Sequence, residues 1–124
     1  MNNREIGRAC ESNAVSYLEK NGYMIIDKNY RMGRYGEIDV IAKDGEYLCF
    51  IEIKARATNY FGTPAEAVRF DKQLTIKNVA LKYLKENHLE DSPIRFDVVE
   101  INFDKTKKVN KINITGIHLI RNAF

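Results

Sequence analysis

The segment from residue 36 to residue 54 constrains the fold more than any other part of the sequence. Two runs of β-forming residues flank the dipeptide Asp44-Gly45, an arrangement typical of a tight type I′ hairpin turn. The second run, from Tyr47 to Ile51, is apolar almost without interruption until Glu52. Such a run is expected of a strand that is covered on both faces. We therefore predict a hairpin at the centre of a sheet.

The other elements follow from periodicity and from residues that begin or end helices. Apolar residues at helical spacing predict a helix from Arg4 to Lys20, which Gly22 would end. A second helix is predicted to begin at Thr63-Pro64-Ala65-Glu66 and to run to about Asn87, allowing for a break near Phe70. Strands are expected at Met24–Tyr30, Glu37–Lys43, Glu46–Lys54, Ile94–Phe103 and Lys111–Ile120. The order α-β-β-β-α-β-β predicts an α/β or α+β domain around a central mixed sheet.

Length and composition limit the classes of function. The 124 residues suit a single domain, 1–124, and 44% hydrophobic with 30% charged residues is ordinary for a folded protein. A net charge of +3 permits a nucleic-acid partner without requiring one. The two cysteines lack metal-ligand spacing, and no apolar run is long enough for a signal core or a membrane span. We therefore expect a cytoplasmic protein that does not bind membranes.

The predicted hairpin also carries the candidate chemistry. With Asp44 and Gly45 forming the turn, Asp39 lies opposite Phe50 and is a diagonal neighbour of Glu52, with Cα atoms roughly 7–8 Å apart. Glu37 then lies opposite Glu52, and Lys54 shares their face because residues two apart on a strand point the same way. A solvated, charged sheet edge is the ordinary explanation of such a group. On a central strand, however, carboxylates are costly unless they are paired or bind a metal.

A divalent metal at this position has a specific chemistry. Hard oxygen ligands favour Mg²⁺ or Mn²⁺, and we expect Asp39, Glu52 and the main-chain carbonyl of Ile53 to hold the ion. The ion would bind a scissile phosphate and lower the pKa of a bound water. Lys54 would orient that water or offset charge that builds up in the transition state. Glu37 is either an acid that supports the ligands or an exposed strand residue.

These residues resemble a known nuclease signature within a known family. Asp39 followed by Glu52-Ile53-Lys54 is similar to the PD-(D/E)xK signature of restriction-endonuclease-like nucleases, with Ile38 in place of the proline. A wider set of motifs resembles the bacterial YraN family. They are Gly36 to Asp39, Phe50 to Arg56, Phe61-Gly62, Arg95 to Val99, Gly7 with Glu11, Gly22-Tyr23, and Asn29 to Arg31. The resemblance covers essentially the whole chain.

The resemblance implies the restriction-endonuclease-like fold, in a branch similar to archaeal Holliday-junction resolvases. In that branch a first-helix glutamate joins the catalytic and metal-binding carboxylates, and Glu11 is the matching residue. The leading hypothesis is metal-dependent cleavage of DNA, with branched or damaged structures as candidate substrates, and the sequence leaves RNA open as the alternative. The candidates for nucleic-acid contacts near the site are Arg31, Arg34, Arg56, Lys72 and Gln73, although a solvated surface role is the commoner one for each of them taken alone.

Two other functions stay open at the level of sequence. A non-catalytic nucleic-acid-binding module would keep the same fold and charge without turnover. An interaction protein, whose acidic hairpin meets a basic partner, has no positive support in the sequence. A homodimer would suit a nuclease that cuts two strands.

Overall fold

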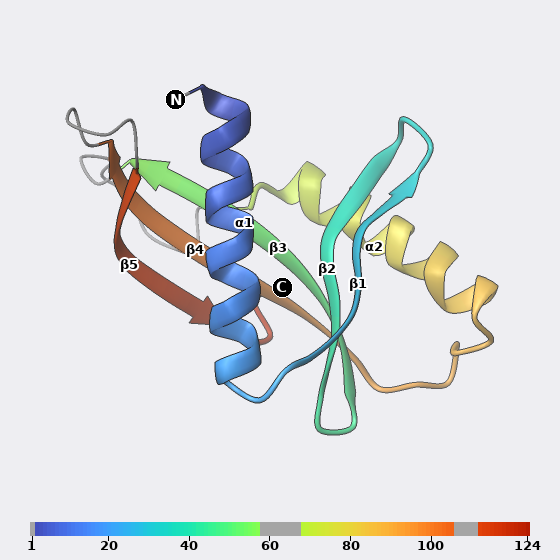
Figure 1. The fold of residues 1–124 in the computed structure, drawn as a ribbon. Coiled ribbons are helices and arrows are strands. Elements are labelled where there is room, and N and C mark those ends of the chain that lie inside the picture. Colours follow the sequence, from blue (N-terminus) through green and yellow to red (C-terminus); the bar gives the residue numbers. More distant parts are fainter. Residues whose placement is uncertain (1, 58–67, 106–111) are drawn as a thin grey trace.

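The computed structural model describes residues 2–57, 68–105 and 112–124. Within these ranges the chain forms α1 (Asn3–Lys20), β1 (Met24–Met32), β2 (Gly36–Asp44), β3 (Tyr47–Ala57), α2 (Phe70–Glu86), β4 (Ile94–Lys105) and β5 (Ile112–Ile120) (Figure 1). The order α-β-β-β-α-β-β is as predicted, and the strand ends differ by a few residues. The helix start predicted at Thr63-Pro64-Ala65-Glu66 lies outside the described residues.

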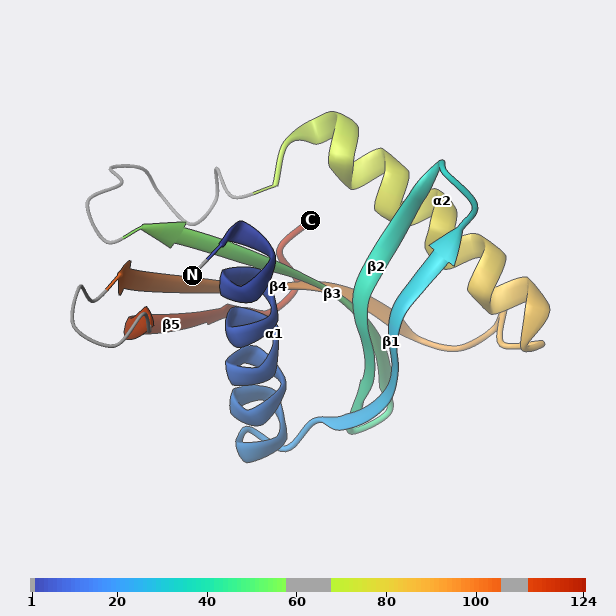
Figure 2. The same ribbon diagram turned by 45° about the horizontal axis from the view of Figure 1, so that its top comes forward.

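The five strands form one mixed sheet in the order β1-β2-β3-β4-β5, with β1 and β5 at the edges (Figure 2). Neighbouring strands are antiparallel except β3 and β4, which run parallel from the pair Leu48–Ile94 to the pair Ala57–Phe103. A parallel pair requires a crossover connection, and α2 lies in the chain between these two strands. This α/β architecture confirms the fold class expected from the sequence.

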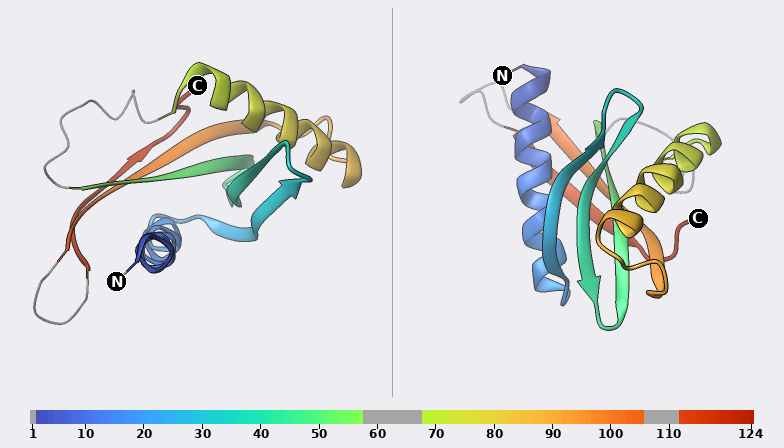
Figure 3. Two further views of the ribbon diagram at one scale, coloured as in Figure 1. Left: turned by 90° about the horizontal axis from the view of Figure 1, so that it is seen from above. Right: turned by 90° about the vertical axis from the view of Figure 1, so that its right-hand side faces the viewer.

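The two helices cover opposite faces of the sheet (Figure 3). On the α1 face, Cys49 and Ile51 of β3 pack in a cluster with apolar residues of the helix. On the α2 face, Leu48 and Phe50 belong to a second cluster. Burial on both faces explains why β3 is apolar along most of its length. Neither of the helices described is long and apolar enough to cross a membrane.

The end of α1 is set by Gly22, as the sequence predicts. Gly22 has φ of +91°, a conformation that favours glycine, and its N–H donates to the carbonyl of Glu19. The N–H of Tyr23 donates to the carbonyl of Leu18, which completes a Schellman motif. The chain therefore turns sharply from α1 into β1.

The prediction that Asp44 and Gly45 form the two central residues of the β2–β3 turn was wrong. Asp44 still pairs with Tyr47, and the two turn residues are Gly45 and Glu46. Gly45 has φ of +61°, whereas Glu46 is not among the residues with positive φ. This is the pattern of a type II′ turn, which takes glycine at its first central position.

The turn shifts the β2–β3 register by two residues. Ile41, and not Asp39, lies opposite Phe50. Among the described residues the pairing ends at Val40 and Ile51, so the predicted pair of Glu37 with Glu52 does not form. Beyond this point β2 and β3 diverge (Figure 1).

Candidate active site

The candidate site lies at the fork where β2 and β3 separate. Asp39 on β2 and Glu52 on β3 are the first residues beyond the last backbone pair of the two strands. Their side chains are therefore held by adjacent strands at a place where no backbone ladder fills the space between them.

A side-chain hydrogen bond ties Asp39 to β3. The backbone N–H of Ile53 donates to its Oδ2 over 2.8 Å. Burial raises the pKa of the Asp39 carboxyl above its usual range, the Ile53 hydrogen bond opposes this, and the negative charges of Glu37 and Glu11 add to it. Asp39 is therefore fixed in position, but its charge is only partly compensated.

Glu52 is the more deeply buried of the two carboxylates, with 8% of its surface exposed. Burial, followed by the nearby charge of Asp39, raises the pKa of Glu52 to about 7. Lys72 of α2 opposes this, but its Nζ is 3.8 Å from Oε1, which is too long for a strong hydrogen bond. The site therefore has more negative charge than its own side chains neutralise.

Lys54 and the start of α2 form one side of the fork. Glu52, Lys54 and Lys72 line a cavity of about 280 Å³ together with Arg69 and Asp71. The Lys54 ammonium is exposed, and its charge lowers the pKa of Glu52. Arg69 and Asp71 were not singled out from the sequence. The signal that could have identified them is their charge at the start of α2.

The other predicted acids lie on the opposite side, facing α1. Glu11, Glu37 and Asp39 line a second cavity, of about 230 Å³, beside Ile53. Glu11 accepts a 3.1 Å hydrogen bond from the Asn29 side chain, and the Arg31 guanidinium lies 3.2 Å from Glu37. The four charged residues predicted to share one hairpin surface are thus divided between two cavities, Glu37 and Asp39 in one and Glu52 and Lys54 in the other.

The chemistry of these side chains fits a hard divalent cation. Two buried carboxylates with raised pKa values gain most from a cation between them. Across residues 2–57, 68–105 and 112–124, no three His, Cys, Asp or Glu side chains are grouped closely enough to hold a metal. Asp39 and Glu52 are therefore the two side-chain candidates, and Mg²⁺ commonly completes its coordination with waters.

The residues predicted to contact nucleic acid separate into two groups. Arg31 and Lys72 have exposed side chains that pair with Glu37 and Glu52, whereas Arg34 is exposed in the β1–β2 turn. Arg56 is buried, and its Nε is 3.7 Å from Glu100 Oε2. Gln73 donates a 3.0 Å hydrogen bond to the Val68 carbonyl just before α2. The exposed group suits phosphate contacts, whereas the other two residues are engaged within the fold.

Comparison with known proteins identifies the family. The sequence model of the uncharacterised protein family UPF0102 matches residues 10–101. A UPF0102 protein of Acetivibrio thermocellus is 43% identical, covering 99% of this chain and 93% of its own length. One from Caldicellulosiruptor bescii is 45% identical over the full length of both chains, and one from Clostridioides difficile is 45% identical over 90% and 96%. The chain belongs to the UPF0102 family, which is the YraN family expected from its motifs.

Proposed function

We propose that this protein is a Mg²⁺-dependent endonuclease that hydrolyses DNA phosphodiester bonds. The observation that carries the proposal is the pair of undercompensated carboxylates at the fork, with Asp39 hydrogen-bonded to Ile53 and acting electrostatically on Glu52. Lys54 follows Glu52 by two residues and lines the same cavity. The order Asp, Glu, Lys along the chain is that of the PD-(D/E)xK nucleases.

Each residue has a distinct role in this reaction. Asp39 and Glu52, with the Ile53 carbonyl, would hold Mg²⁺, which supplies Lewis-acid activation of the phosphate and of the attacking water. The Ile53 N–H donates to Oδ2 of Asp39 and so orients the carboxylate that would hold the ion. Lys54 offsets the negative charge that develops on the phosphorus oxygens in the transition state. Glu11, which lines the α1-facing cavity together with Ile53, would accept a hydrogen bond from the attacking water.

The substrate class follows from the size of the domain. A chain of 124 residues with few exposed basic residues around the site has little surface for reading base edges in a groove. We therefore expect recognition of DNA structure, such as a branch or a lesion, over recognition of sequence. Phosphate contacts from Arg31, Arg34 and Lys72 would position the backbone without specifying bases.

The test is a cleavage assay on labelled linear duplex, single-stranded, flap and four-way-junction DNA, with RNA duplex as comparison, in Mg²⁺, Mn²⁺ or EDTA. Metal-dependent cutting is expected in the wild type and should fall by roughly 100-fold or more in Glu52→Gln and Lys54→Ala. Glu46→Gln, in the exposed β2–β3 turn, is the matched control and should cut normally. Cutting that persists in Glu52→Gln would overturn the proposed mechanism.

A non-catalytic nucleic-acid-binding module is the second candidate. It is favoured by the finding that, in the described part of the chain, no third ligand side chain joins Asp39 and Glu52. On this alternative every DNA would remain intact in each metal while the wild type still bound it. The same set of substrates therefore decides between the two functions.

A further inference from the structure

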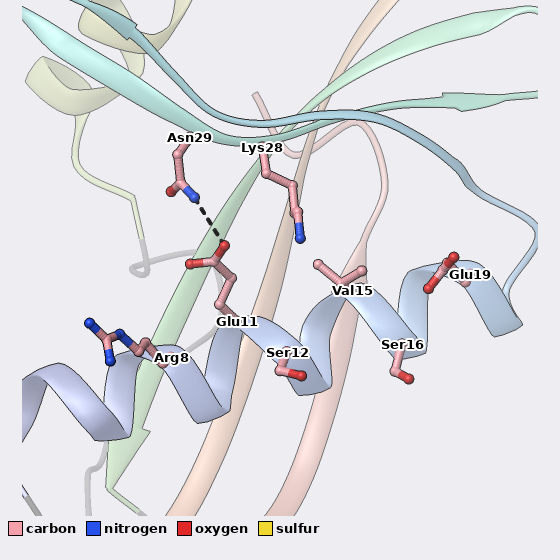
Figure 4. A pocket seen from close by; sticks show the side chains of 8 residues that line it. All are labelled: Arg8, Glu11, Ser12, Val15, Ser16, Glu19, Lys28 and Asn29. Carbon is pink, nitrogen blue, oxygen red and sulfur yellow. Dashed lines mark hydrogen bonds between the residues drawn. The ribbon is translucent and has the colours of Figure 1, made fainter.

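A groove of about 530 Å³ runs between α1 and β1, and of the residues assigned to catalysis it shares Glu11. The α1 residues that line it recur every three or four positions and so form one face of the helix. Lys28 and Asn29 of β1 form the facing wall, and Figure 4 shows the Lys28 side chain extended toward the helix (Figure 4). This face is distinct from the buried stripe by which α1 packs on the sheet.

The groove adjoins the α1-facing cavity of the candidate active site. Glu11 and Asn29 line both the groove and the cavity that contains Asp39. Their side chains are joined by a 3.1 Å hydrogen bond at the boundary (Figure 4). Asn29 has φ of +55°, and the β1–β2 register places it across from Asp39. The groove and the α1-facing cavity are therefore neighbours that share the wall formed by Glu11 and Asn29.

The side chains of the groove suit a sugar–phosphate backbone. Arg8 and Lys28 are exposed, and neither forms an ion pair within the described residues, although Glu11 and Glu19 line the same groove. Two uncommitted cations are available for phosphates, and the hydroxyls of Ser12 and Ser16 can donate further hydrogen bonds. Glu19, toward the C-terminal end of α1, and Glu11, whose hydrogen-bond partner is the neutral Asn29 amide, are the two lining charges that oppose an anion there.

The length of the groove sets the size of its ligand. Arg8 and Glu19 are eleven residues apart on α1, which spans about 16 Å at 1.5 Å per residue. This corresponds to roughly four or five nucleotides of one duplex strand at 3.4 Å each. A single phosphate or free nucleotide would fill only part of it.

We propose that this groove binds the nucleic-acid strand that flanks the scissile phosphate, with Arg8 and Lys28 contacting its phosphates. The proposal rests on the proposed nuclease function, because that function places the scissile phosphate, and with it the flanking strand, next to Asp39. It adds a binding surface on α1 and β1 to the residues around the fork. Glu19 limits affinity at the far end of the groove.

The experiment measures binding in EDTA, where no cleavage occurs. Fluorescence anisotropy of a labelled four-way junction and a labelled linear duplex gives Kd at several NaCl concentrations. Arg8→Ala and Lys28→Ala should each weaken binding about 5-fold and reduce the slope of log K against log salt by about 1. Glu19→Gln should tighten binding about 2-fold or more, which loss of a merely structural side chain would not do. Lys85→Ala, an exposed cation in the last turn of α2, is the charge-matched control and should leave Kd unchanged.

The outcomes separate this proposal from the proposed function. An unchanged Kd in both Arg8→Ala and Lys28→Ala overturns the proposal that the groove binds nucleic acid, even if the wild type cuts DNA with Mg²⁺. Weakened binding in both variants, with tighter binding in Glu19→Gln, supports the groove even if no substrate is cut. The proposal that the groove binds nucleic acid is also overturned if the wild type binds neither the four-way junction nor the linear duplex in EDTA.

Discussion

The Oδ2 atom of Asp39 on β2 accepts a 2.8 Å hydrogen bond from the backbone N–H of Ile53 on β3. This side-chain bond continues the contact between the two strands just past the point where their backbone pairing ends. It also places the carboxylate beside Glu52, the neighbour of Ile53. One interaction therefore joins the local fold to the charge of the candidate site.

Two substitutions at Asp39 should separate these contributions. Asp39→Asn keeps an oxygen acceptor for Ile53 and removes a buried charge, so its metal-free stability should equal or exceed that of the wild type. Asp39→Ala also leaves the Ile53 N–H without its acceptor, which costs about 1–3 kcal/mol. Thermal denaturation with and without Mg²⁺ tests this, and Mg²⁺ should stabilise neither variant. Equal stabilisation of Asp39→Asn and wild type by Mg²⁺ would contradict a metal role for this residue.

Glu52 should give the metal-free protein an unusual pH dependence. Its folded-state pKa of about 7 lies above the ordinary value of 4.5, so the folded state holds the proton more tightly. Stability in EDTA should therefore fall by about 3 kcal/mol from this group as pH rises from 4.5 to 7. Urea denaturation across this range is the measurement. Glu52→Gln should flatten the profile, and an identical profile in the variant would assign the effect to another group.

Asp44 should affect the pH dependence of stability in the opposite direction to Glu52, and at lower pH. Its hydrogen bond with Arg95, at 2.6 Å, is the main cause of a pKa below the usual range for that carboxyl, and Arg121 adds to it. The unfolded chain therefore takes up the proton first, and the stabilisation present at neutral pH is lost on acidification through the usual Asp range. Asp44→Asn should lose less stability than the wild type between about pH 5 and pH 3. Parallel acid-denaturation curves for the two proteins would argue against this ion pair.

Gly36 should be intolerant of even a methyl group. A Cβ there would collide with the Cγ2 methyl of Thr75 on α2 and lie 3.5 Å from a Val79 methyl. Gly36→Ala should cost about 1–3 kcal/mol by overpacking, as measured by urea denaturation. The double variant Gly36→Ala/Thr75→Ser removes the obstructing methyl and keeps the hydroxyl that donates to the Asp71 carbonyl. Stability should then be largely restored, and a double variant no more stable than Gly36→Ala would rule out this contact as the cause.

The sequence predicts most of the fold because its strongest signals are local. The apolar run of β3 and the glycine that ends α1 each specify their element directly, and the strand order follows. The prediction of the β2–β3 turn was wrong because a contact with a residue distant in the sequence decides which residues form the turn. Asp44 is held at the end of the β2 ladder while its carboxylate binds Arg95, a residue 51 positions away in the chain. The local preference of Asp-Gly for a type I′ turn does not include that interaction.

The candidate site was predictable in its residues and less so in its arrangement. Asp39, Glu52 and Lys54 are found at one fork, because residues close to a hairpin stay close under a small change of register. Which cavity each side chain lines depends on where β2 and β3 separate. The periodicity of the sequence does not indicate that point. Arg56 was expected near phosphates, but the parallel pairing of β3 with β4 brings Glu100 within 3.7 Å and buries the guanidinium.

The parallel pairing of β3 with β4 also has a consequence for the folding pathway. The β1–β2–β3 meander joins residues that are close in the chain, whereas β3 and β4 pair residues as distant as Leu48 and Ile94. Local contacts close small loops and form quickly, while distant ones lower the folding rate. We therefore expect the strands that carry Asp39 and Glu52 to associate before β4 docks. The completed burial of Glu52 would then be a late event, and the nascent chain would hold its two acidic residues in water until the sheet closes.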